Sequence, residues 1–199
     1  MKTRFTHILS TGLFTALIFL GNAVNGNSIR GGGDKNDGFI DWNSGNKLTW
    51  NNFKAEASEE DKGFAFAYTD IDCFYSINDG LIHYQVSAVF YEDESWVKDD
   101  ARNPVTLFWQ QLNFDLTAQF AYKLSDALSN HNFAAKDEEK FNKTVSKIKY
   151  DWQMTQLDFF AEMNHYTNDF KHVKKWASKV GYNPKELKAN LFPEVADVE

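Results

Sequence analysis

The chain has 199 residues, of which 43% are hydrophobic and 25% charged, and 28 acidic against 21 basic residues give a formal charge of −7. This composition is ordinary for a folded protein and excludes a disordered tail, a collagen-like fibre and a multi-pass membrane protein. The acidic balance argues against a nucleic-acid partner, because phosphate binding needs a basic face.

The N-terminus has the pattern of a secretory signal peptide. Met1 to Arg4 is basic, residues 5–20 are mostly apolar, and the small residues Gly21 and Ala23 follow. An uncleaved anchor is the alternative, but the apolar run is short for a spanning helix. We therefore expect a signal peptide over 1–23, a flexible Gly/Asn-rich leader over 24–38, one domain over 39–192 and an acidic tail over 193–199. The predicted location is the periplasm or the exterior of a bacterium, with no membrane span after cleavage.

Strands are expected in the first half of the domain. Residues 47–50 form a short candidate strand, and residues 64–77 are rich in Phe, Tyr, Ile and Thr. Asn78-Asp79-Gly80 predicts a hairpin turn between this run and the next. Residues 82–90 then alternate between apolar and polar side chains, which predicts a strand with one buried face.

Helices are expected in the second half. Asn103-Pro104 is a typical helix start, and apolar residues at intervals of four predict an amphipathic helix over 105–128. A second long helix is predicted over 137–163 and a third over 169–180, which Gly181 ends. Strands followed by helices predict an α+β domain with a small antiparallel sheet.

Few residues suggest chemistry on their own. Cys73 is the only cysteine, so no internal disulfide can form, and we expect it in the core. His83, His131, His165 and His172 contain no pair three or four apart. Packing is the expected role of Phe64, Phe66, Phe90, Phe120 and Trp152, whereas Trp96, Trp109, Tyr166 and Trp176 are candidates for lining a cleft.

Four segments carry a resemblance when taken in order. They are Leu48-Thr49-Trp50-Asn51-Asn52-Phe53, then Ser95-Trp96-Val97, then Gln111 with Phe114-Asp115-Leu116, and finally Glu162-Met163-Asn164-His165. Over residues 47–180 the chain resembles the bacterial secreted family called domain of unknown function 922, whose members are zinc-dependent protease-like. The resemblance implies a zincin-like fold with a His-Glu-x-x-His helix, in which two His bind zinc and the Glu is the general base.

The positions that the resemblance makes catalytic hold other residues. Trp109-Gln110-Gln111-Leu112-Asn113 stands where the family has its motif, and the two His and the Glu are replaced by Trp109, Asn113 and Gln110. Trp has no lone pair for a metal, and Gln cannot take up a proton at neutral pH. His165 is the only surviving candidate ligand, and Glu162 is a possible carboxylate behind it.

The favoured function is that of a secreted, catalytically inactive member of this family, which keeps the former active-site cleft for a peptide or protein ligand. No cofactor is expected. One alternative is an active metallohydrolase or peptidase with a zinc site rebuilt around His165, Glu162 and Asn113. Asp115 is a further candidate carboxylate for such a site, but it is two residues from Asn113 on the helix and should point away from it. Another alternative is a structural envelope or adhesion module, for which Trp109 would be fully buried.

Overall fold

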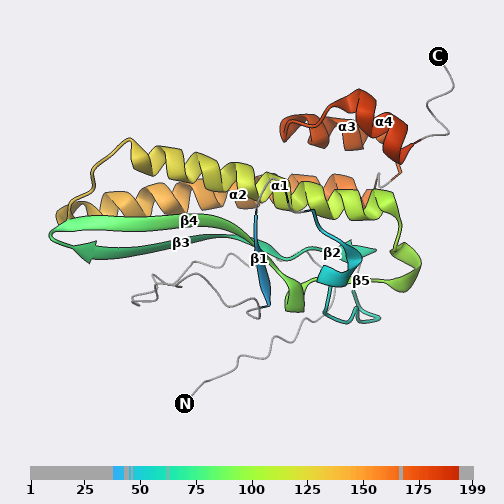
Figure 1. The fold of residues 1–199 in the computed structure, drawn as a ribbon, viewed down its shortest axis with the longest axis horizontal. Coiled ribbons are helices and arrows are strands. Elements are labelled where there is room, and N and C mark those ends of the chain that lie inside the picture. The colour runs from blue at the N-terminus through green and yellow to red at the C-terminus, as the bar shows by residue number, and fades with distance from the viewer. Residues whose placement is uncertain (1–37, 43–44, 46, 62, 166–167, 193–199) are drawn as a thin grey trace.

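The computed structural model describes residues 38–42, 45, 47–61, 63–165 and 168–192. The predicted signal peptide, residues 24–37 of the predicted leader, Tyr166 and the predicted acidic tail lie outside these residues. Two long helices lie on a small antiparallel sheet, and a pair of short helices packs on the side away from the strands (Figure 1). The α+β class is confirmed.

A long hairpin forms most of the larger sheet. Strands β3 (Thr69–Asn78) and β4 (Leu81–Tyr91) pair antiparallel, and β1 (Phe39–Asp41) pairs with the end of β4 in the order β1-β4-β3. Asp79 and Gly80 have φ angles of 51° and 76°, the left-handed conformations that a tight hairpin turn requires. The hairpin is confirmed. Burial alternates over the first half of β4, but Ala88, Val89 and Phe90 are all buried, so the prediction of one buried face is wrong for its second half.

The run over 64–77 is not one strand, because the chain changes partners at Ala67 and Tyr68. Strand β2 (Ala65–Phe66) pairs with β5 (Trp96–Val97) in a separate two-stranded sheet. Side chains of the first long helix bind the backbone of Ala67, and the Tyr68 N–H donates to Ser95 Oγ at 2.9 Å. These bonds replace the strand pairing that would have continued β2 into β3.

The strand expected over 47–50 is wrong. A single 3-10 turn occupies Trp50–Asn52, with the Thr49 N–H donating to Asn52 Oδ1 at 2.8 Å. The Leu48 N–H donates to the side-chain oxygen of Gln111 at 2.8 Å. The backbone groups that a strand would need are therefore already bonded to side chains.

The helices follow the predicted starts closely. Helix α1 (Pro104–Ser129) is capped by Asn103, whose side chain accepts the Thr106 N–H at 2.9 Å. Helix α2 (Glu138–His165) buries Phe141, Ile148, Trp152, Phe159 and Met163. Helix α3 (Phe170–Lys179) is followed by Gly181 at a φ of 90°. Helix α4 (Pro184–Leu191) was not expected, although Asn183-Pro184 repeats the Asn-Pro start of α1.

Helix α1 is central rather than simply amphipathic. Its residues 109–118 are all buried, because the sheet, α2 and α3 all pack against it. One hydrophobic cluster joins α1 to the hairpin and to the first half of α2, and a second joins it to the end of α2, α3 and α4. Polar side chains in this stretch must therefore find partners inside the protein.

Cys73 and Phe64 were both expected to pack in the core, and the structure places them differently. Cys73 is half-buried against the first cluster, and burial raises the pKa of its thiol to about 11. Phe64, by contrast, is 50% exposed, so its predicted packing role is wrong. In the described part of the chain, no helix is both long and apolar enough to cross a membrane.

Candidate functional site

Trp109 occupies the first position of the resemblance-implied motif and lies in the second hydrophobic cluster. Its side chain is 0% exposed, and its ring meets that of Phe159 edge-on at 5.3 Å between centroids. Beside it, Thr106, Gln110 and Met163 border a cavity of about 10 Å³. That space is at the lower limit for one water molecule and cannot admit a peptide side chain.

Gln110 and Asn113 bind the two polar groups of one residue. The Ala67 N–H donates to Gln110 Oε1 at 2.9 Å, and Asn113 Nδ2 donates to the Ala67 carbonyl oxygen at 2.9 Å. Gln110 Nε2 also lies 3.5 Å from the sulfur of Met163. The side chains at the implied general-base and second-ligand positions therefore fix the irregular segment between β2 and β3 onto α1.

A neutral hydrogen-bond network continues from Asn113. Gln156 of α2 donates through Nε2 to Asn113 Oδ1 at 2.8 Å and to Thr69 Oγ1 at 3.1 Å. The hydroxyls of Thr69 and Thr117 lie 2.9 Å apart, and Trp152 Nε1 donates to Thr117 Oγ1 at 3.2 Å. Because no member carries a charge, the network satisfies buried polar groups without the cost of burying an ion.

Asp115 lies on another side of α1 and joins distant parts of the chain. Its Oδ1 accepts from Trp42 Nε1 at 2.7 Å and from Gln111 Nε2 at 2.8 Å, and its Oδ2 accepts from the Tyr182 hydroxyl at 2.6 Å. Lys47 Nζ lies 4.0 Å from Oδ2. Burial and the neighbouring Asp115 carboxylate both raise the pKa of the Tyr182 phenol. Asp115 shares no partner with Asn113, as their spacing predicts.

Glu162 connects α2 to α3. Its Oε2 accepts from His172 Nδ1 at 3.0 Å and from Trp176 Nε1 at 3.1 Å, and its Oε1 accepts from Lys175 Nζ. Burial favours the neutral acid, but the bonds from Lys175, His172 and Trp176 outweigh it and lower the pKa of Glu162 to about 2. This carboxylate therefore works as an ionised bridge between helices.

His165 lies at the end of α2 with its side chain exposed and its Nδ1 2.8 Å from the carbonyl oxygen of Ala161. His165, Glu162 and Asn113 form these hydrogen bonds with different residues, and none of the bonds joins one of the three to another. No group of three or more His, Cys, Asp or Glu side chains within the described residues is arranged to hold a metal ion. Glu162 and Asn113 therefore already use their side-chain polar atoms in bonds to other residues.

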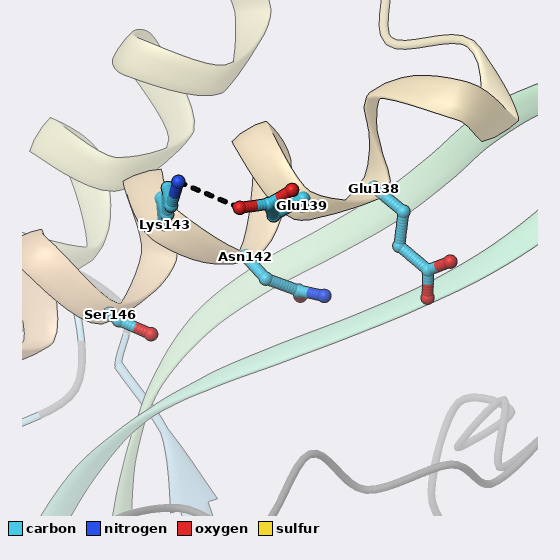
Figure 2. Close-up of a pocket in the computed structure, with 5 residues that line it drawn as sticks. All are labelled: Glu138, Glu139, Asn142, Lys143 and Ser146. Atoms are coloured by element: carbon cyan, nitrogen blue, oxygen red, sulfur yellow. Dashed lines mark ion pairs between the residues drawn. The ribbon is translucent and has the colours of Figure 1, made fainter.

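The described tryptophans that were candidates for lining a cleft do not lie together at one cleft. Trp109 and Trp176 are buried in the second cluster, whereas Trp96 is only partly buried on β5. A shallow hollow of about 530 Å³ lies elsewhere, along the first turns of α2, and Figure 2 shows the side chains that line it. There Lys143 pairs with Glu139 at 2.7 Å, and Glu138 accepts from the Tyr75 hydroxyl at 2.6 Å. Glu138, Glu139 and Lys143 therefore already have bonded partners.

Gln156, Trp42 and Tyr182 bind α1 side chains and were not expected to do so from the sequence. Trp42 and Tyr182 stand 73 and 67 residues from Asp115, and no local pattern predicts contacts over such separations. We found no significant match of the chain to a protein-family model, a curated protein or a solved structure.

Proposed function

We propose that this protein is an exported, catalytically inactive relative of the zinc-dependent protease-like family that it resembles. In this proposal helix α1 keeps its central place, and its former catalytic positions have become structural. The basic start and apolar run of residues 1–20 support export.

One observation carries the proposal. Gln110 and Asn113 bind the N–H and the C=O of Ala67, which leaves both amides engaged inside the protein. A general base needs a group that can take up a proton, and a zinc ligand needs a lone pair directed at the ion. Gln110 supplies no such base, and the amide oxygen of Asn113 already accepts from Gln156.

The full burial of Trp109 favours a function that does not use the former cleft. With a cavity of about 10 Å³ beside its indole, a peptide side chain has no room next to Trp109. The protein would then act through its outer surface, as a binding module or as a structural component of the envelope. A rebuilt metal site around His165 is less well supported, because Glu162 is committed to His172, Lys175 and Trp176.

A peptidase assay tests the proposal. The full chain is incubated with casein and with a mixture of fluorogenic peptides, with added zinc in one arm and EDTA in the other. We expect cleavage no faster than in the protein-free blank in both arms. Cleavage that EDTA abolishes and His165→Ala removes would contradict the proposal and favour the rebuilt site.

A further inference from the structure

The outward face of the small β2–β5 sheet is aromatic. Along residues 64–68 the side chains alternate, with Ala65 and Ala67 buried and the other three directed to the opposite side. Those three are Phe64, Phe66 and Tyr68, and Phe64 is 50% and Tyr68 37% exposed. The solvent face of an antiparallel sheet is ordinarily polar, so this arrangement is unusual.

The rings form a continuous row. Phe66 lies opposite Trp96 of β5, with ring centroids 6.4 Å apart, and 6.2 Å from Tyr68. Tyr91 extends the row at 5.4 Å from Tyr68, and Phe160 of α2 lies 5.7 Å from Phe66. We call this surface the aromatic face; it consists of Phe64, Phe66, Tyr68, Tyr91, Trp96 and Phe160. Phe64 and Tyr68 are exposed and the other four are partly buried. Aromatic groups gathered at a surface in this way are typical of interaction sites.

The aromatic face has acidic surroundings. The backbone of Ala55 bridges that of Trp96, and the Lys98 N–H donates to the Phe64 carbonyl oxygen, so the segments 54–61 and 92–102 flank the face. Their basic residues are Lys54, Lys98 and Arg102, and their acidic residues are Glu56, Glu59, Glu60, Asp61, Glu92, Asp93, Glu94, Asp99 and Asp100.

The three basic side chains of these two segments already have partners within the protein. Lys54 pairs with Glu92 at 2.6 Å, Arg102 lies 3.5 Å from Asp99, and Lys98 Nζ donates to the Asp61 carbonyl oxygen at 2.6 Å. Burial and then the negative charges of Glu94, Asp70 and Asp72 raise the pKa of Tyr68 in the middle of the face. In both flanking segments the carboxylates therefore outnumber the basic groups, while Lys62, next to the first segment, lies outside the described residues.

We propose that the aromatic face binds a cationic peptide segment of a partner protein, with Arg or Lys side chains over the rings. Cations are attracted to aromatic faces, and the flanking carboxylates add long-range attraction for the same charge. A second copy of the chain is disfavoured, because it would bring the same acidic segments into contact. The inference rests on the proposed function in one respect, namely that the protein acts through its surface.

The direct test is the binding of a defined peptide to the full chain. The probe is a fluorescently labelled tetra-arginine peptide, and its matched control is the tetra-citrulline peptide, which keeps the shape but lacks the charge. Fluorescence anisotropy is measured at 50 and 300 mM NaCl. We expect saturable binding of tetra-arginine, at least tenfold weaker binding of tetra-citrulline, and weakening of the tetra-arginine complex at high salt.

Variants show whether the aromatic face is the site. Phe64→Ala removes an exposed ring and should weaken binding at least fivefold, while Tyr150→Ala, at a 56% exposed residue of α2 outside the face, should leave it unchanged. Glu94→Gln, next to the aromatic face, should weaken binding. Asp126→Asn, near the C-terminal end of α1 and outside the face, should not. Circular dichroism confirms that each variant is folded.

The inference would be overturned by equal binding of the two peptides, by equal effects of Phe64→Ala and Tyr150→Ala, or by a concentration-dependent dimer that Phe64→Ala abolishes. Saturable binding of chitohexaose without binding of tetra-arginine would also overturn it, in favour of a glycan. None of these results bears on peptidase activity, so failure of this inference is distinct from failure of the proposed function.

Discussion

Gln110 and Asn113, three residues apart on α1, hold the N–H and the C=O of the same residue, Ala67, at 2.9 Å each. This arrangement ends the β2 pairing and directs the chain into β3. It also explains how a helix with ten consecutive buried residues can contain amides, because each amide has a partner. The segment of helix that the resemblance makes catalytic is thus a structural element of this fold.

Restoring the carboxylate of the implied motif should be costly. Gln110→Glu places an ionisable group at a 1% exposed position, where one backbone N–H donates to the side chain and the Met163 sulfur can only accept a hydrogen bond from it. Burial should raise the pKa of this Glu above its unfolded value of about 4.3, so the cost is absent below about pH 4 and grows above it. We expect a loss of about 2–4 kcal/mol at pH 7.

The measurement for Gln110→Glu is urea unfolding at pH 4 and pH 7. Gln85→Glu, at an exposed position of β4, is the matched control and should be close to neutral at both values. A variant as stable as the natural protein at pH 7 would mean that this position tolerates an ionised acid, as an active centre requires.

Removing the indole of Trp109 should open space in the second cluster. Trp109→Ala is expected to destabilise the protein by about 3–5 kcal/mol, because a large ring in full contact with its neighbours is lost. Indole added to the solution should fill the cavity and raise the melting temperature of the variant, but not that of the natural protein. A loss below about 1 kcal/mol would show that the ring is not part of the core.

The Asp115–Tyr182 contact should stabilise the fold by joining the C-terminal segment to α1. Tyr182→Phe removes a 2.6 Å hydrogen bond to a carboxylate and should cost about 1.5–3 kcal/mol. A double-mutant cycle with Asp115→Asn should give a coupling energy of about 0.5–3 kcal/mol. Additive effects of the two substitutions would contradict the contact, and Tyr150→Phe serves as the exposed control.

Glu162 should make stability depend on acid pH. Its pKa falls from 4.5 to about 2 on folding, so its stabilising effect is complete above about pH 4.5 and is lost as the pH falls towards 2. Because the side chain is 21% exposed and solvent screens its ion pairs, we expect a contribution of about 1–2 kcal/mol. Glu162→Gln should remove this part of the pH dependence in urea unfolding between pH 2 and 5, and an unchanged profile would contradict it.

Local signals predicted much of the fold. Asn78-Asp79-Gly80 specified the hairpin and Asn103 the start of α1, because both act within a few residues. The same Asn-Pro signal at Asn183 would have predicted α4. The break at Ala67 was not predictable in this way, since it depends on α1 side chains more than 40 residues later.

The candidate site was predicted less completely for the same reason. The sequence shows that Trp109, Gln110 and Asn113 lack the chemistry of a zinc protease, but not what these residues contact instead. Their partners come from β3, α2 and the segment between β2 and β3, and only the folded chain brings them together. Phe64 was misjudged because an aromatic residue in a strand-like run reads as core, whichever face of the sheet it occupies.

Zinc content is the most direct measurement of the central claim, that α1 has a structural and not a catalytic role. The full chain is dialysed against micromolar zinc, then against zinc-free buffer, and the metal is determined by elemental analysis with His165→Ala in parallel. We expect less than about one zinc per ten chains, the same in both proteins. One tightly held zinc per chain, lost in His165→Ala, would contradict it.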